Sequence, residues 1–476
     1  MKPSWSAALW LGLAACLLAS PGCHMVGPDY RGPPPGSVVN APTAQGSFIN
    51  ASGPEFVPES VPAAWWHLYD SEVLDQLIAQ AMAANTDLRA AQANLERSAA
   101  FLEEARTRRQ PSASINFDPS YQQLSAESYL HPGSVTPTGL YDTGLSVSYE
   151  IDLFGRLRRL VEAAKSDEEA IKAAYDLTKI TVAAETARAY AMVCNTGEEL
   201  TAARRSLQLQ LRSAAVTQRL LEAGRAPVLD FTRSSGLAAQ LKAAIPSLEA
   251  ERSDALYTLA ALTGRPPAEY PRSVESCIEA PRLYQPIPVG DGAALLRRRP
   301  DVREAERRLA AATARIGVAT ADLYPRVALG LSAGSTGTLT DILSGPTNRY
   351  GVGIGIHWQA NQSVTRAQIA AAGSTARAAL AVFDGVVLTA LRDTETALST
   401  YARERQRDLN LAEAQSRAQE AEQQAQRLYN GGKVDFLALL DAQRTLASAD
   451  GALAASHAQL ATDQIAIFLA LGGGWE

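Results

Sequence analysis

The chain consists of long stretches with helical spacing, interrupted by two pairs of short alternating segments. Apolar residues recur at intervals of three, four or seven from Leu160 to Ala191, within the segment 156–222, which contains no proline. A helix of that length, at about 1.5 Å per residue, extends for about 100 Å. In the last stretch an apolar residue recurs every seventh position, at Leu439, Leu446, Leu453, Leu460 and Ile467. This spacing predicts a coiled-coil seam.

The alternating segments predict two β-hairpins, over residues 112–153 and 326–358. In the first hairpin Ala113, Ile115 and Phe117 alternate with small polar residues, and its second strand alternates in the same way. Strands of about ten residues with this pattern are typical of outer-membrane barrels. A half-buried sheet of a soluble protein alternates identically, so the pattern alone leaves both interpretations open. We expect exposed loops at about 122–139 and 333–350, which are rich in Ser, Gly, Pro and Thr.

The order of elements occurs twice. Residues 87–117 align without gaps to residues 301–331, and both segments end with a helix, a proline and an alternating strand. The two later turns also match, because Arg219-Leu220-x-x-x-Gly224-Arg225 corresponds to Arg427-Leu428-x-x-x-Gly432-Lys433. We therefore predict two tandem units of about 210 residues each.

The predicted division of the chain follows from this repeat. The first unit is 64–267, with the hairpin 112–153, a long helix 156–222, a turn near 224 and a return helix 227–263. A connector, 268–294, leads to the second unit, 295–476, with the hairpin 326–358, a long helix 361–430, a turn near 432 and a return helix 434–471.

The N-terminus predicts secretion. Lys2, a short apolar stretch and Ser20-Pro21-Gly22 form a signal peptide over 1–22, too short for a spanning helix. Cys23 follows directly, as in a bacterial lipobox, and is the expected site of acylation. Cleavage before Cys16 and a plain signal with an unmodified Cys23 are the alternatives. The proline-rich segment 23–63 then predicts an extended tether.

Composition narrows the functional class. Apolar residues make up 46% of the chain but aromatic residues only 6%, which favours closely packed helices of Ala and Leu. The net charge of −6 argues against nucleic-acid binding. No C-x-x-C or H-E-x-x-H motif and no set of acid, base and nucleophile is present, so we expect neither an enzyme nor a metal or cofactor site. Nothing in the sequence indicates whether Cys194 and Cys277 pair.

Beyond residue 22 no window holds 18 uncharged apolar residues, so any membrane span is expected to be β. Two hairpins give four strands, which are too few to close a barrel. The chain must therefore complete its sheet with other copies.

Five motifs carry a resemblance to a known family. They are Cys23–Tyr30, Tyr149–Arg156, Leu295–Arg303, Ile316–Ala319 and Leu471–Trp475. Together they resemble TolC-like outer-membrane efflux proteins, specifically the lipoprotein branch that serves RND-type multidrug pumps. The segment from Trp358 to Gln362 departs from the family, which often has a Phe-Gly or Asn-Trp-Gly turn there.

The resemblance implies a mainly α-helical fold with a β-barrel part. Three copies would close a twelve-stranded barrel in the outer membrane, on a helical tunnel that extends into the periplasm. This channel would passively conduct drugs or other small molecules, with a periplasmic adaptor and an RND-type inner-membrane transporter as partners. The alternative is a periplasmic coiled-coil adaptor or structural lipoprotein without a pore.

The resemblance also implies site residues. The two tips and adaptor-docking turns fall at Gly224, Arg225, Gly432 and Lys433. Tyr429 matches a tyrosine that closes the tunnel, and Asp441 matches one of two acidic residues that ring its entrance. The second acidic residue falls at Ala438, a departure, and Asp435 is a candidate only because it lies nearby. Apart from the covalent lipid on Cys23, no cofactor is implied.

Overall fold

The computed structural model describes residues 25–123, 125, 133, 136–283 and 285–473. Its α-helices are α2 (Pro42–Gln45), α3 (Glu72–Ala84), α4 (Thr86–Thr107), α5 (Arg156–Glu222), α6 (Val228–Leu262), α7 (Gly292–Arg298), α8 (Pro300–Ala321), α9 (Ser363–Asn430) and α10 (Phe436–Ala470). Its strands are β1 (Phe56–Val57), β2 (Ser112–Gln122), β3 (Thr138–Ile151), β4 (Ile287–Pro288), β5 (Arg326–Thr338) and β6 (Asn348–His357). Short 3₁₀ helices are η1 (Val38–Asn40), η2 (Trp65–Tyr69), η4 (Pro267–Glu269), η5 (Arg272–Val274) and η6 (Gly345–Thr347).

The chain divides into two compact units that share the long helices. One includes Leu95–Ile171 and Ala305–Phe383, with the four long strands. The other includes Pro34–Asn94, Lys172–Glu304 and the chain from Asp384 onward.

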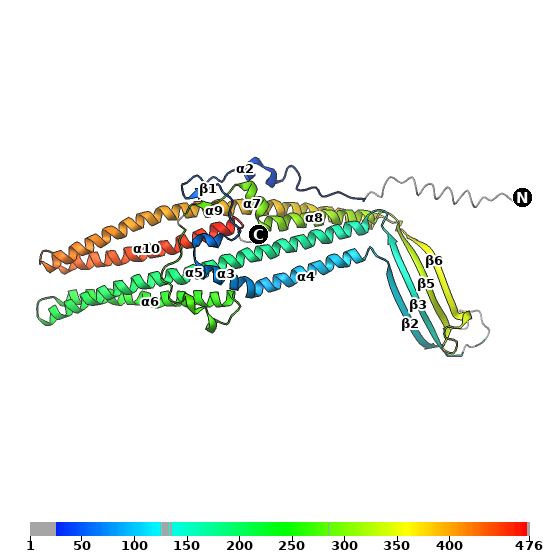
Figure 1. Cartoon of the computed structure of the whole chain (residues 1–476), viewed down its shortest axis with the longest axis horizontal. Helices are drawn as coiled ribbons and strands as arrows, with labels where there is room; N and C mark the ends of the chain where they lie inside the picture. The colour runs from blue at the N-terminus through cyan, green and yellow to red at the C-terminus, as the bar shows by residue number, and fades with distance from the viewer. Residues whose placement is uncertain (1–24, 124, 126–132, 134–135, 284, 474–476) are drawn as a thin grey trace. The chain divides into compact units, whose positions relative to one another are not determined.

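The four long strands form one antiparallel sheet in the order β2-β3-β5-β6 (Figure 1). β2–β3 and β5–β6 are the two hairpins, and β3 pairs with β5 from Leu140↔Thr338 to Ile151↔Val327. The two repeats are therefore joined within one sheet, and its edge strands β2 and β6 have no further partner strand among the residues that the structure describes.

One face of this sheet is apolar across all four strands. Ile115 lies opposite Leu145, Val147 opposite Leu331, and Leu329 opposite Ile354. These side chains are solvent-exposed in the single chain, Ile115 to 82% and Ile354 to 67%. An apolar face that is left open in this way fits contact with lipid rather than a buried protein core.

The predicted boundaries of the loop at 333–350 are wrong at both ends. Strand β5 continues to Thr338, and strand β6 already begins at Asn348. Polar residues near these strand ends are held by Tyr141. Its hydroxyl group lies 2.6 Å from Ser335 Oγ and 3.1 Å from Thr347 Oγ1. These hydrogen bonds between hydroxyl groups hold β3, β5 and the start of β6 together beyond the residues that alternate between apolar and polar.

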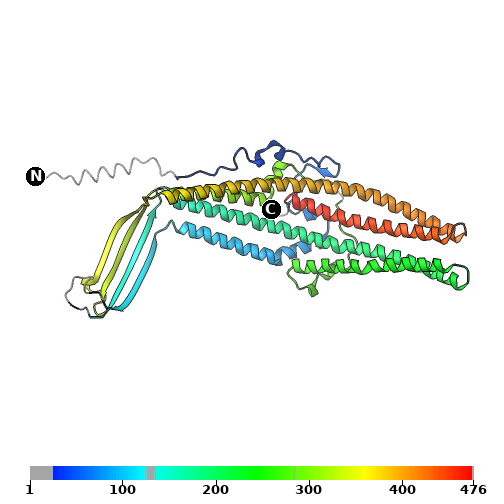
Figure 2. The ribbon, with the colours of Figure 1, turned by 180° about the vertical axis from the view of Figure 1, so that it is seen from behind.

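The core of the compact unit that includes Pro34–Asn94 surrounds Trp65. This residue is fully buried and stacks on Phe468 at 4.7 Å between ring centroids. Leu74, Leu77 and Ile78 of α3 add to this core. Ser71 caps α3 by accepting a hydrogen bond from Leu74 N (3.4 Å). α6 lies beside α5 and α10 beside α9 in both ribbon views, as two helical hairpins (Figure 2).

The segment before α3 is not the uniformly extended tether expected from its prolines. It contains η1, α2 and β1, and β1 pairs in parallel with β4 of the connector. It also follows α9. Val38 N donates to Asp384 (3.1 Å), Ile49 N to Glu395 (2.6 Å), and Arg405 donates to Glu55 (3.4 Å). Side chains of α9, two acceptors and one donor, thus hold this segment against the helix.

Cys194 of α5 and Cys277 of the connector form a disulfide. The connector approaches α5 closely at this point, because a Cβ atom on Gly197 would lie 2.2 Å from the carbonyl oxygen of Cys277. Arg252 of α6 donates to the carbonyls of Glu275 (2.6 Å) and Cys277 (2.9 Å). The connector is therefore bound to both helices of the helical hairpin α5–α6.

Within the described residues one helix, α9, has an 18-residue window apolar enough to cross a membrane, with a mean hydropathy of 1.4 and 22% of the window buried. A lone helix with this composition is weak evidence of a span.

Candidate functional site

The first described residues dock where β3 meets α5. Val26 N donates to the carbonyl of Phe154 (3.2 Å). Arg159 side-chain nitrogens donate to the carbonyls of Val26 and Gly27, both at 3.2 Å, and to Asp29 (2.6 Å). The Arg159 side chain is 1% exposed and also pairs with Glu162 (2.7 Å). Arg159 therefore fixes the segment that follows Cys23.

Two glycines allow this docking. Gly27 has φ +83°, and a Cβ atom there would lie 2.4 Å from Cα of Gly317 in α8. A Cβ atom on Gly317 would lie 2.8 Å from Nε of Arg159. The Gly317 motif and the motif after Cys23 thus meet in space, which explains why both contain glycine.

The unusual segment after β6 also has a defined structure. Trp358 Nε1 donates to the carbonyl of Leu323 (3.0 Å), and Gln362 Nε2 donates to the same carbonyl (3.3 Å). Asn361 Oδ1 accepts from Ser363 N (3.2 Å) at the start of α9. Side chains here replace the glycine turn common in the family.

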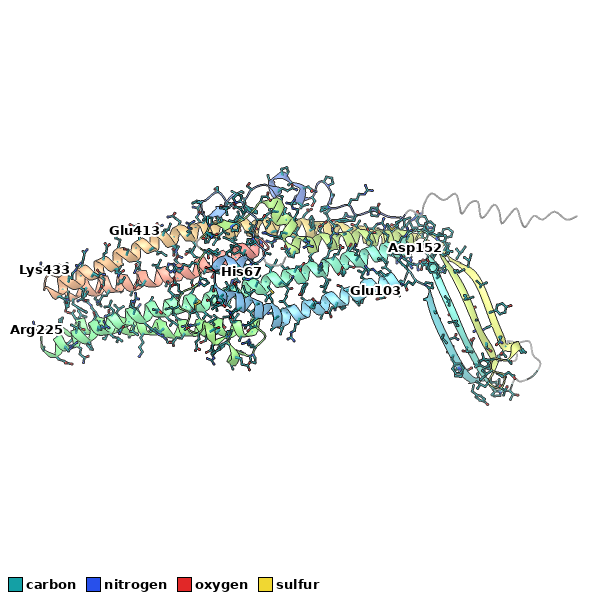
Figure 3. The ribbon with its side chains drawn as sticks, viewed as in Figure 1. His67, Glu103, Asp152, Arg225, Glu413 and Lys433 are labelled. Atoms are coloured by element: carbon teal, nitrogen blue, oxygen red, sulfur yellow. A yellow bond between two sulfur atoms is a disulfide. The ribbon has the colours of Figure 1, made fainter. Side chains whose placement is uncertain are left out.

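The turns of both helical hairpins have the same geometry. Gly224 has φ +68° and Gly432 has φ +66°. The next residue closes each helix through a backbone bond, from Arg225 N to Leu220 O (2.8 Å) and from Lys433 N to Leu428 O (2.9 Å). This is a Schellman motif with a left-handed glycine. Arg225 and Lys433 lie at the same end of the two hairpins (Figure 3).

Tyr429 belongs to a small apolar cluster close to these turns. Its ring packs on Phe436 of α10 at 5.7 Å, and Leu237 of α6 belongs to the same cluster. Burial, and secondarily the nearby charge of Asp230, raise the pKa of Tyr429 above its usual value. The cluster joins the helical hairpin α5–α6 to the helical hairpin α9–α10.

Asp441 lines a groove of about 400 Å³ between α6 and α10, together with Arg233 and Arg444. Its carboxylate lies 3.8 Å from Arg444, and both side chains are 71% exposed. Asp435 has a different environment, because its carboxylate caps α10 by accepting from Ala438 N (2.9 Å). Arginines therefore partly offset the charge of Asp441, whereas Asp435 is used in capping.

Sequence reasoning missed three arginines. Arg233 and Arg444 carry no motif. Arg444 lies three residues after Asp441 on α10, a spacing that indicates their contact, whereas Arg233 reaches the groove only because α6 packs on α10. Arg159 stands in a run with Arg156 and Arg158, and nothing in that run distinguishes it, because its contact with Asp29 depends on a long-range approach. Among the residues that the structure describes, no group of three His, Cys, Asp or Glu side chains is arranged to hold a metal ion.

Comparison with known proteins decides the family. The model of the outer membrane efflux protein family matches residues 77–265 and 293–473. The chain belongs to the outer membrane efflux protein family. It is 32% identical to the pyoverdine export outer membrane protein OpmQ of Pseudomonas putida, over 93% of this chain and 94% of that protein. It is 28% identical to the toluene efflux pump outer membrane protein TtgF of Pseudomonas putida, over 97% and 96%.

Solved structures agree. The outer-membrane channel OprN is 34% identical and superposes with a TM-score of 0.86, covering 94% of this chain and 99% of that one. The open-state MtrE channel of Neisseria gonorrhoeae, 24% identical, has the same fold, with a TM-score of 0.80 over 95% and 99%.

This efflux protein is accordingly an outer-membrane channel subunit with a TolC-like fold, whose helices form a periplasmic tunnel. Channels of this kind are trimers, and they work with an adaptor and an RND-type transporter in tripartite pumps. The family and its structural neighbours are channels rather than enzymes. The assignment favours the channel over a coiled-coil lipoprotein without a pore.

The Gly432 turn provides a test of the tip assignment. We expect Gly432→Val to strain the turn by about 1–2 kcal/mol, because a β-branched residue disfavours the left-handed conformation. No neighbouring atom lies within 4 Å of the new Cβ, so the effect is confined to the backbone. Trimers should still form, while drug export measured in cells that lack other outer-membrane channels should fall.

Gly431→Val is the matched control, because Gly431 is adjacent but does not have a positive φ. Full export by the Gly432 variant, or equal loss in both variants, would contradict the assignment of this turn to adaptor docking.

Proposed function

We propose that this channel is anchored by a lipid on Cys23, docks its adaptor through the turns at Gly224–Arg225 and Gly432–Lys433, and is gated by Asp441 and Tyr429. It acts without enzymatic chemistry or a resident cofactor. The observation that carries the proposal is the cluster of Tyr429, Phe436 and Leu237, which ties together the two hairpins whose turns lie side by side.

Contacts next to Cys23 support the lipid anchor. Cys23 lies outside the described residues, but Met25 lies against Gly155, where a Cβ atom would be 2.7 Å from its Cγ. Two residues span at most about 7 Å. The described chain therefore starts two residues after the proposed lipid, near the helix ends of the strands and close to the stacked rings of Phe154 and Tyr324 (4.4 Å). Aromatic residues at such strand ends are typical of the membrane interface.

We expect mass spectrometry of the mature N-terminus to find acyl chains on Cys23. Cys23→Ser should reduce the fraction of protein in the outer membrane without preventing trimer assembly, since the sheet also holds the protein in the membrane. Cys16→Ser is the control and should leave the modified peptide unchanged. An unmodified Cys23, or a mature chain that begins at Cys16, would refute the anchor.

The environment of Asp441 supports a gate with a small net charge. Threefold symmetry repeats Asp441 around one axis, and a ring of carboxylates at a constriction attracts cations. Arg444 is repeated in the same way at 3.8 Å from Asp441. Opposite charges so close together reduce the cation preference that the carboxylates alone would give.

Purified trimers in planar bilayers should therefore form pores of small conductance with modest cation selectivity. Asp441→Asn should lower this selectivity and relieve block by divalent cations, whereas Arg444→Gln should raise the selectivity by removing the opposing charge. Reversal potentials in a salt gradient measure both effects.

Asp435→Asn is the internal control, because asparagine caps a helix about as well as aspartate. The gate assignment would be wrong if Asp435→Asn abolished selectivity and block while Asp441→Asn changed neither.

We also propose that the exported compounds are small organic molecules selected mainly by the transporter. Relatives with the same domain are named for compounds as different as pyoverdine and toluene. Exchange of the cognate transporter while this channel is retained should change the resistance profile, whereas exchange of the channel should leave it unchanged.

A further inference from the structure

A cavity at the end of the sheet is not used by any role described so far. It has a volume of about 550 Å³ and lies between the end of α4, the end of β3 and the start of α5. Arg106, Arg109 and Gln110 line it from the α4 side, and Tyr149, Asp152 and Arg158 line it from the β3–α5 side. β2 begins only at Ser112, which pairs with Ser148, so the sheet leaves Tyr149 without a β2 neighbour.

The carboxylates of this cavity already have partners. Glu150 accepts from Arg156 at 2.7 to 3.1 Å in a bidentate pair. Asp152 accepts from the backbone N of Leu157 (3.1 Å) and of Arg158 (2.9 Å). Asp152 also pairs with the Arg158 side chain (3.3 Å), so each acid has an arginine partner within the strand-to-helix turn.

Two guanidinium groups on the α4 side remain available. Arg106 has only a loose partner, Glu103 at 3.5 Å, and its side chain is 53% exposed. The exposed side chain of Arg109 has no hydrogen bond or ion pair with any residue that the structure describes. Paired guanidinium groups in a pocket suit the oxygens of a phosphate, which they bind in a bidentate manner.

The apolar face of the sheet begins at the same cavity. Tyr149 lies on that face, and Ile115 and Leu145 lie opposite each other further along it. Glu103 on α4 and Asp152 at the end of β3 lie close to this helix-to-strand boundary (Figure 3). In an outer-membrane channel with periplasmic helices, this boundary is at the level of the headgroups of the periplasmic leaflet, which is composed of phospholipid.

We propose that the cavity binds the phosphodiester group of a phospholipid from the periplasmic leaflet. Arg106 and Arg109 donate to the phosphate oxygens, Gln110 lies beside the glycerol, and the acyl chains follow Ile115 and Leu145 along the sheet. The bound lipid then fills the space beside Tyr149, where β2 has no residue because it begins only opposite Ser148.

Native mass spectrometry of the full-length trimer, titrated with phosphatidylglycerol in a neutral detergent, tests this site. We expect one tightly retained lipid per subunit, and about tenfold weaker retention in the double variant Arg106→Gln, Arg109→Gln, because both donors to the phosphate are lost. Arg97→Gln is the matched control, since Arg97 is an exposed arginine of α4 outside the cavity and should leave retention unchanged.

Three results would overturn the proposal. Equal retention by the double variant would place the lipid elsewhere, and the absence of retained lipid would mean that a neighbouring subunit covers the cavity. Competition by soluble glycerol phosphate at the same concentration as the lipid would indicate a site for free anions. The two single arginine variants, checked for heat-modifiable trimers, separate loss of binding from loss of assembly.

Discussion

Reduction of the Cys194–Cys277 disulfide is expected to destabilise the helical part of this channel by about 2–5 kcal/mol, the usual range for a native crosslink. The crosslink closes a loop with a sequence separation of 83 residues, so its loss frees a long segment in the unfolded chain. Without it, the connector is held by Val274, which is 1% exposed, and by the bonds from Arg252. We expect the apparent unfolding temperature to fall and a protease to cut first between 268 and 283.

The double variant Cys194→Ser, Cys277→Ser supplies the control. A reductant should lower the unfolding temperature of the wild-type trimer to that of the variant and should leave the variant unchanged. Identical unfolding temperatures and cleavage patterns for the oxidised and reduced wild type would show that the other contacts are sufficient to hold the connector.

Substitution of Gly317 should have the largest effect in the strand-bearing unit. A valine there would place its Cβ within 2.9 Å of three Arg159 atoms, which have no free space because the Arg159 side chain is 1% exposed. If Arg159 is displaced, Asp29 loses its ion pair with Arg159, and the carbonyls of Val26 and Gly27 lose their donor. Because Asp29 is 47% exposed, solvent compensates part of the lost ion pair. We expect residues 25–33 to detach and to exchange their amide hydrogens much faster.

Gly373→Val in α9 is the matched control, because it adds the same side chain to a helical glycine whose nearest neighbour is 3.8 Å away. Hydrogen exchange followed by mass spectrometry measures both variants. Unchanged exchange in 25–33 for Gly317→Val would show that α8 and Arg159 adjust to the extra side chain and that the contact with Gly27 is not essential.

Local patterns allowed much of this fold to be predicted from the sequence. The alternation around Ile115 and Leu145 predicted the hairpins, since side chains on a strand point to opposite faces. Likewise, the repeated motifs at Gly224 and Gly432 predicted turns there, and both glycines adopt the left-handed conformation. In each case the signal lies within a few residues of the feature.

Contacts between distant segments could not be predicted in this way. All four strands alternate alike, so their pattern does not reveal that Val147 of β3 lies opposite Leu331 of β5. Cys194 and Cys277 carry no spacing motif, and Arg159 is one of several arginines in a basic run. The roles given to Tyr429 and Asp441 came from family resemblance, because neither lies in a local pattern that distinguishes it from other coiled-coil residues.

The stacking of Trp65 on Phe468 sets a constraint on the order of biogenesis. Trp65 precedes Phe468 by 403 residues, so it reaches the periplasm well before Phe468 does. Their contact, like the contact between Glu55 and Arg405, forms only after nearly the whole chain has been secreted. Until then the apolar segment around Trp65 is exposed. We therefore expect the nascent chain to depend on periplasmic chaperones, and truncations just before Phe468 to be degraded rather than assembled.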